Sequence, residues 1–268
     1  MRLPGSTEFK RVPPNCRYPA YVCPEPTEEL SGLVVAIPWR NPVNRLVGLL
    51  NTSVGQKLVL AVSGLALVGF LLVHMLGNLT IFQGADVMNG YAAWLKGHPL
   101  LWAARCSLIG LFLIHITLAI RLALSNRKSR PIGYQHARIN QETTVISRYI
   151  VLTGLLVLSF LIYHVLHFTV GVIQPDHALF IDSQGRHDVY KMVVQSFQVP
   201  IVAISYLAAM AILGLHLIHG LQSLFQTFGL FHETYTGLIR ACCIALASLI
   251  VIGNASIPLS VWLGLISL

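Results

Sequence analysis

The chain has 268 residues, of which 55% are hydrophobic and only 10% are charged, and its formal net charge is +8. Soluble domains carry about 25% charged residues, so this composition excludes an ordinary soluble protein and indicates a multi-pass membrane protein. The lysines and arginines lie between apolar runs, which points to membrane topology and argues against nucleic-acid binding.

Residues 1–50 form a polar, proline-rich segment that lacks the apolar run and cleavage site of a signal peptide. We predict that this segment is cytoplasmic, and that it is either a disordered tail or an extended strip lying on a partner protein. Residues 51–268 then form the membrane domain.

Five apolar runs are long enough to cross a bilayer as helices: 58–81, 100–124, 148–173, 197–225 and 238–262. A hydrocarbon core of about 30 Å needs about 20 helical residues, and a helix satisfies its own backbone hydrogen bonds within the span. The predicted fold is therefore an all-α integral membrane domain with five transmembrane helices.

Positive charge collects on one side of this topology. The loop RLALSNRKSRPIGYQHAR, between the second and third spans, is the most basic, and the N-terminal flank is also basic. The opposite loops balance their few positive charges with aspartates. Because cytoplasmic loops carry the excess of Lys and Arg, we predict a plasma-membrane protein with a cytoplasmic N-terminus and an external C-terminus.

The first and third spans contain the same phrase. Residues 63–74 read SGLALVGFLLVH and residues 153–164 read TGLLVLSFLIYH. Both spans run outward from a basic flank, so at about 1.5 Å per residue His74 and His164 reach similar depths in the outer half of the membrane. Ser63 and Thr153 lie on the same helix faces as these histidines.

The second and fourth spans run inward and carry their histidines in the inner half. His115 lies in LFLIHITLAIRLAL, and His216 and His219 lie in AILGLHLIHGLQSLFQTFG. The fifth span has no histidine. The sequence therefore predicts an outer pair, His74 with His164, and an inner pair, His115 with a fourth-span histidine.

Paired histidines at two depths favour bis-histidine haem. Ionisable groups inside a membrane are costly and usually mark function. No Asp or Glu lies in the central part of any span, which argues against di-iron, hard-cation and carboxylate proton-relay sites. Neutral imidazoles on facing helices can bind a haem iron from both sides, so we predict that the first four helices form a di-haem bundle.

The inner-half ligand of the fourth span remains open between two histidines. Gly220 follows His216 by four residues and leaves room for a flat macrocycle, which favours His216 over His219. Ser205 precedes His216 by the same eleven residues that separate Ser63 from His74.

The third span offers a similar choice. The repeated phrase favours His164, whereas Gly171, four residues after His167, favours His167. We prefer His164. The histidines that are not ligands are candidates for hydrogen bonds to haem propionates or to the ligands themselves.

Three stretches carry a family resemblance: GQKLVLAVSGLALVGFLLVHMLGNL, TGLLVLSFLIYHVLHF and HLIHGLQSLFQTFG. Across roughly residues 50–265, the chain resembles the di-haem cytochrome b membrane anchor, of the b558 type, of succinate dehydrogenases and fumarate reductases. The resemblance implies outer-haem ligands at His74 and His164 and inner-haem ligands at His115 and His216. The ligand-histidine and glycine pattern of the fourth span falls on His216 and Gly220.

The resemblance also implies a subunit with no dicarboxylate active site of its own. A flavoprotein subunit would oxidise succinate and an iron–sulfur subunit would relay the electrons. The anchor would then pass them through two haem b groups to a quinone, which in this family is most often menaquinone.

Polar residues near the membrane surfaces are candidates for binding the quinone headgroup. The outer candidates are Asn78, Asp86, Tyr91, Trp94 and Lys96, and the inner ones are Ser53, Gln56, Lys57 and Arg148. The candidates for haem propionates are Lys57, Arg105, Arg121 and Arg148. Interfacial anchoring and snorkelling explain these positions equally well. We expect the loop histidines His98, His136, His177, His187 and His232 to be solvated.

Two other functions remain open. One is the cytochrome b anchor of another respiratory dehydrogenase, such as a hydrogenase or a formate dehydrogenase. The other is a transporter that uses its intramembrane histidines for a soft metal ion or for protons.

Overall fold

The computed structural model describes residue 48, residues 51–129 and residues 149–268. The chain divides into two units, Met1–Arg45 and Leu46–Leu268, and all described residues belong to the second. Except for Gly48, the predicted N-terminal segment lies outside the described residues, as does Arg148.

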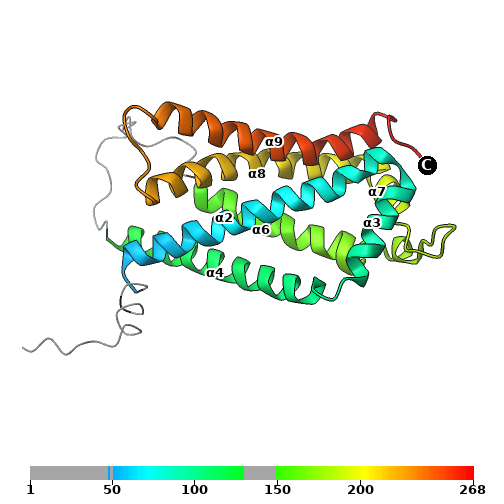
Figure 1. Cartoon of the computed structure of the whole chain (residues 1–268), viewed down its shortest axis with the longest axis horizontal. Helices are drawn as coiled ribbons and strands as arrows, with labels where there is room; N and C mark the ends of the chain where they lie inside the picture. Colours follow the sequence, from blue (N-terminus) through cyan, green and yellow to red (C-terminus); the bar gives the residue numbers. More distant parts are fainter. Residues whose placement is uncertain (1–47, 49–50, 130–148) are drawn as a thin grey trace, which may run out of the picture. The chain divides into compact units, whose positions relative to one another are not determined.

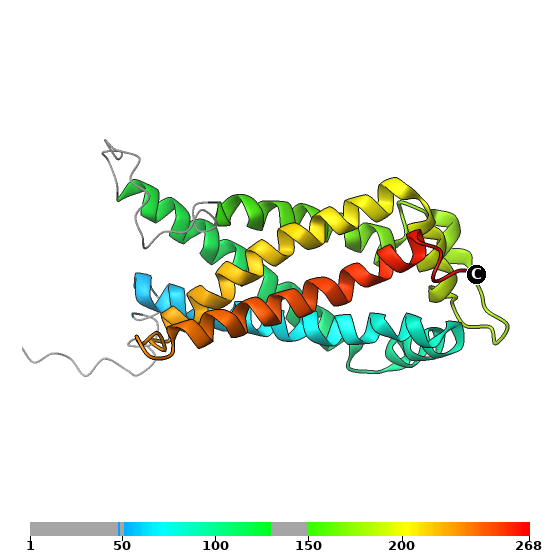
Figure 2. The same cartoon turned by 90° about the horizontal axis from the view of Figure 1, so that it is seen from above.

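Within the described part, five helices are long and apolar enough to cross a membrane, which confirms the predicted all-α fold. They are α2 (Ser53–Asn78), α4 (Leu101–Lys128), α6 (Ile150–His164), α8 (Pro200–Thr227) and α9 (Thr236–Trp262). Figures 1 and 2 show these helices running alongside one another. A 3₁₀ turn, Leu79–Gln83, extends α2, and a π-helical segment, Val165–Val170, extends α6.

Two shorter helices at one end of the bundle were not predicted. They are α3 (Ala85–Gly97) and α7 (Val189–Gln198), and they pack against each other at the end where the C-terminus lies (Figure 1). The predicted fourth span, 197–225, ran across the boundary between α7 and α8. Pro200 occupies the first turn of α8, where the missing backbone N–H costs nothing, and this defines where the membrane helix begins.

The spanning helices pack as two similar helix pairs plus α9. In the first helix pair α2 packs against α4, and in the second α6 packs against α8. Because the repeated phrase lies on α2 and α6, it marks the first helix of each pair. The close contact of α8 with α9 uses small residues: Ala209 and Ala247 are buried, and a Cβ on Gly214 would lie 3.0 Å from Val251.

Candidate functional site

The outer histidines meet between the first helices of the two helix pairs. The ring centroids of His74, on α2, and His164, on α6, are 5.8 Å apart in an edge-to-face arrangement. A phenylalanine one turn earlier packs on each ring, Phe70 at 5.4 Å from His74 and Phe160 at 5.9 Å from His164. The two phenylalanines occupy the same place in the repeated phrase, so that phrase builds both walls of the outer site.

A hydrogen bond indicates the tautomer of His74. The side-chain amide of Asn78 donates to Nε2 of His74 at 3.0 Å. An amide nitrogen can only donate, so Nε2 carries the lone pair and a neutral imidazole carries its hydrogen on Nδ1. Asn78, which is a predicted quinone contact, thus lies against the outer histidine.

The inner histidines rest on the starts of the repeated phrases. The Ser63 hydroxyl, on α2, lies 3.3 Å from Nδ1 of His115, on α4, and 3.0 Å from the carbonyl oxygen of Leu60. Since the hydroxyl hydrogen goes to that carbonyl, the Ser63 oxygen accepts from the Nδ1–H of His115.

Thr153 repeats this arrangement in the second helix pair. Its hydroxyl donates to the carbonyl oxygen of Ile150 at 3.0 Å and lies 3.3 Å from Nδ1 of His216, on α8. By the same reasoning as for Ser63, His115 and His216 both carry the hydrogen on Nδ1 and the lone pair on Nε2.

The glycine after each hydroxyl residue lets the neighbouring helix approach. A Cβ on Gly64 would lie 3.2 Å from Cε1 of His115, and a Cβ on Gly154 would lie 3.3 Å from Cε1 of His216. Ser63–Gly64 and Thr153–Gly154 are therefore equivalent platforms for the two inner histidines. Sequence reasoning missed both glycines, although each opens the repeated phrase directly after its hydroxyl residue.

His167 uses both ring nitrogens in hydrogen bonds. Its Nδ1 lies 3.0 Å from the hydroxyl of Tyr206, its Nε2 lies 2.8 Å from Oε1 of Gln174, and the residue is only 3% exposed. Gly171, which favoured His167 as a ligand, ends the π-helical segment with φ +78°, in the left-handed region that glycine adopts readily. Its position therefore has a backbone explanation.

The other predicted site residues lie apart from these contacts. Gly220 is exposed and has open space where a Cβ would be. The Ser205 hydroxyl donates to the carbonyl oxygen of Val202, on its own helix. The Arg105 guanidinium lies 5.0 Å above the Trp102 ring. No hydrogen bond joins His219 to another described side chain.

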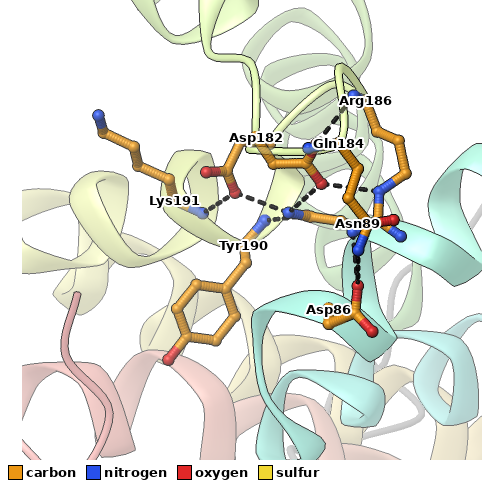
Figure 3. Close-up of polar contacts among 8 residues, drawn as sticks. Asp86, Asn89, Asp182, Gln184, Arg186, Tyr190 and Lys191 are labelled. Carbon is orange, nitrogen blue, oxygen red and sulfur yellow. Dashed lines mark hydrogen bonds and ion pairs between the residues drawn. The ribbon is translucent and has the colours of Figure 1, made fainter.

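A polar network ties α3 to the segment before α7 (Figure 3). Asn89, only 1% exposed, donates to Asp188 at 2.9 Å and to Asp182 at 3.4 Å, and it accepts from the backbone N–H of Tyr190 at 2.9 Å. Arg186 pairs with Asp86 and with Asp182, both at 2.7 Å. Asp86, a predicted quinone contact, is thus part of a structural network.

This network borders a shallow cavity of about 410 Å³. The lining includes Asp86, Asn89, Asp182 and Arg186, all already joined to one another. Of the remaining outer quinone candidates, Tyr91 packs against Gly77, whereas Trp94 and Lys96 are exposed. The inner candidates Ser53 and Lys57 are exposed in the first turns of α2, and Gln56 is half-buried there.

Three loop histidines, including His98, are half-buried and not solvated as expected. His177 is half-buried, and its Nδ1 lies 3.1 Å from the Ser196 hydroxyl. His187 is also half-buried, and its Nδ1 has no hydrogen-bond partner among the described residues.

The described residues include no group of three or more His, Cys, Asp or Glu that could hold a metal ion. Imidazoles on facing helices can supply the two nitrogens that a bis-histidine haem would take from a protein. The hydroxyl contacts at Nδ1 leave Nε2 of His115 and His216 available, whereas Nε2 of His74 accepts from Asn78.

One comparison with known proteins found a family match. Residues 126–254 match the family model described as succinate dehydrogenase/fumarate reductase transmembrane subunit. The matched region contains His164 and His216, whereas His74 and His115 precede it. No curated protein and no solved structure matches the chain.

Proposed function

Because residues 126–254 match the succinate dehydrogenase/fumarate reductase transmembrane subunit family model, we propose that the chain is the di-haem anchor of such a complex. It is a multi-pass membrane subunit of an oxidoreductase complex. In the proposed function it holds a flavoprotein subunit and an iron–sulfur subunit at the cytoplasmic face of the plasma membrane. It carries their electrons through two b haems to a quinone, expected to be menaquinone.

The observation that carries this proposal is the common tautomer of the two inner histidines. In His115 and His216, the hydrogen lies on Nδ1, where Ser63 and Thr153 accept it, and the lone pair lies on Nε2. Metal-binding histidines usually donate their other N–H to a fixed acceptor in this way. His74 and His164 would hold the outer haem, and His115 and His216 the inner one.

When bound, each haem supplies a one-electron iron couple. The chain's own residues orient and isolate that group. Ser63 and Thr153 accept the Nδ1–H of the inner ligands, Gly64 and Gly154 let those ligands lie close to the neighbouring helices, and Phe70 and Phe160 pack on the outer ligands. The apolar spans exclude water from both pairs.

The alternative functions lack comparable support. The family match favours a succinate or fumarate catalytic head over a hydrogenase or formate dehydrogenase. Ser63 and Thr153 hold the inner imidazoles at Nδ1 and leave the lone pair on Nε2. This fixed arrangement suits iron ligation better than proton or soft-metal transport, in which the imidazoles must exchange their bound protons or ions. No dicarboxylate chemistry is assigned to this chain.

The proposal is tested by purifying the complex through a tag on this chain. We expect flavoprotein and iron–sulfur subunits to co-purify, two b haems per chain by pyridine haemochromogen assay, and reduction of haem by succinate. His74→Ala should remove the outer haem and His115→Ala the inner one. His232→Ala changes an exposed histidine in the loop after α8 and should keep both.

The absence of a b-type haem absorbance band from the wild-type complex would contradict the haem assignment. Retention of both haems in His74→Ala and His115→Ala would do the same. Co-purification with hydrogenase or formate dehydrogenase subunits would move the chain to that class.

A further inference from the structure

His164 begins a chain of side-chain hydrogen bonds that runs away from the outer pair. Its Nδ1 lies 3.4 Å from the hydroxyl of Tyr206, on α8. That hydroxyl lies 3.0 Å from Nδ1 of His167, and Nε2 of His167 lies 2.8 Å from Oε1 of Gln174. Gln174 in turn accepts from the Ser196 hydroxyl, on α7, at 2.6 Å.

The direction of each hydrogen bond in this series follows from its last acceptor, Gln174. Oε1 of Gln174 can only accept, so Nε2 of His167 donates to it. A neutral imidazole has one N–H, so Nδ1 of His167 accepts, and the single hydrogen of the Tyr206 hydroxyl goes to it. The Tyr206 oxygen must then accept from Nδ1–H of His164, which places the His164 lone pair on Nε2.

The surroundings hold Tyr206 in this role. Tyr206 is 6% exposed and lies within an aromatic cluster, with ring centroids 5.0 Å from both Phe160 and Phe197 and 5.7 Å from Phe168. A buried hydroxyl without a partner is costly, and its partners here are His164 and His167.

The inner pair uses a different device. Ser63 and Thr153 direct their hydrogens to carbonyl oxygens three residues earlier on their own helices, so each inner tautomer depends on one helix pair. The tautomer of His164 depends on side chains from α6, from the segment after it, and from α7 and α8.

We propose that Tyr206, held by His167 and Gln174, is the positioning residue that fixes the tautomer and ring orientation of His164. The proposal rests on the proposed function, since it assigns a role toward a haem ligand. It also gives His167 a role as the link that orients Tyr206.

The test is Tyr206→Phe in the full complex, which removes one hydroxyl and keeps the ring. Each haem is identified from the His74→Ala and His115→Ala spectra, and the complex is then followed by redox titration, electron paramagnetic resonance and haem content. We expect the outer haem potential to rise, because an N–H that donates to an oxygen makes imidazole a more basic ligand and favours iron(III). Outer haem affinity should fall by about 10- to 100-fold, the usual cost of losing such a partner.

Two further variants separate positioning from packing. Tyr163→Phe removes a hydroxyl from the same aromatic cluster and should leave both haem potentials unchanged. The ring centroids of Tyr163 and Tyr206 are 5.7 Å apart. Gln174→Leu removes the acceptor of His167 and should shift the outer potential in the same direction as Tyr206→Phe. The inner haem, unchanged in every variant, reports that the bundle is folded.

The proposal is overturned if Tyr206→Phe leaves the outer haem potential, resonance signal and affinity at wild-type values. It is equally overturned if both haems shift together or if Tyr163→Phe reproduces the effect. A wild-type complex without haem would instead contradict the proposed function, so the two failures are distinguishable.

Discussion

The hydroxyl residues that open the repeated phrase contact histidines of the adjacent helices. Sequence reasoning placed Ser63 and Thr153 on the face that carries His74 and His164, which indicated a polar stripe toward the bundle interior. It could not reveal their contacts with His115 and His216, because these depend on how α2 pairs with α4 and α6 with α8. Ser205 has the same sequence offset but bonds only its own helix, so spacing alone did not predict the contact.

Removing either hydroxyl should weaken the inner haem alone. Ser63→Ala or Thr153→Val takes away the acceptor for an inner Nδ1–H, and we expect about a 10- to 100-fold loss of inner haem affinity. Thr153→Ser keeps the hydroxyl and should retain the haem. Haem titration of the purified apo-complex measures the effect. Ser159→Ala is the control, since that exposed hydroxyl bonds only the carbonyl oxygen of Leu155. Equal losses in Ser63→Ala and Ser159→Ala would contradict the assignment.

Gly64 and Gly69 offer a second comparison on the same helix. A methyl group on Gly64 would lie 3.2 Å from the His115 ring, whereas one on Gly69 would meet nothing within 4 Å. We expect Gly64→Ala to displace His115 and reduce inner haem content, and Gly69→Ala to leave it unchanged. The haem-to-protein ratio of the two purified variants checks this, and a normal ratio in Gly64→Ala would show that His115 can move aside without loss.

At the scale of elements, hydropathy predicted the spans but not what lies between them. Helices α3 and α7 are too short and too polar to register as membrane spans. Asp188 precedes α7 and caps it by accepting from the backbone N–H of Lys191 at 3.0 Å. The π-helical end of α6 also carries no sequence signal, because a single wider turn does not change the apolar pattern. His167 therefore looked like a competing ligand until its contacts with Tyr206 and Gln174 were seen.

Asn89 should be the residue on which the outer network depends most. Asn89→Leu leaves the Tyr190 N–H without its partner and removes one hydrogen bond each from Asp188 and Asp182, and leaving a buried polar group unsatisfied costs about 1–3 kcal/mol. Gln184→Ala removes one exposed bond to Asp86 and should change stability by no more than about 0.5 kcal/mol. Thermal unfolding of the solubilised protein compares the two variants. Similar unfolding midpoints for both would show that the hydrogen bonds of Asn89 do not stabilise the network more than that of Gln184.

The same segment should lose stability in acid. Burial lowers the pKa of His187, and the charge of Lys96 lowers it further, against smaller opposing effects of Asp188 and the Ala178 backbone. An unfolded histidine binds its proton near pH 6.5, so below that pH the unfolded state binds more protons and folding stability falls. His187→Gln should flatten the dependence of the unfolding midpoint on pH between about 7.5 and 5. An unchanged slope would mean that another group titrates there.

Asp182 adds a second loss at lower pH. Burial raises the pKa of its carboxyl, but hydrogen bonds from the Arg186 backbone and side chain and from the Gln184 amide, together with the Arg186 charge, leave the pKa lowered overall. Its stabilising contribution is therefore present above about pH 3.9 and is lost as the pH falls through the lowered folded pKa. The two groups thus act in the same direction over separate pH ranges.

For the whole molecule, composition and hydropathy were sufficient to predict an all-helical, five-span protein, because each spanning helix must be long and apolar regardless of its neighbours. The repeated phrase gains a structural meaning at this scale. It marks two equivalent helix pairs whose first helices meet at the outer histidines. The contact between His74 and His164 was predictable from depth, whereas the network around His164 required the fold of the segment between α6 and α8.

Membrane orientation is the last prediction at this scale. The α8–α9 loop should lie on the cytoplasmic side with the basic end of α4, and the segment before α7, with Asp182 and Asp188, should lie outside. In a chain whose five cysteines are replaced by alanine, the exposed positions Ser183 and Thr234 can each be changed to cysteine. A membrane-impermeant maleimide should label Ser183→Cys in intact cells and Thr234→Cys only after permeabilisation. The reverse pattern would show that the arginines and lysines of this chain do not determine its orientation.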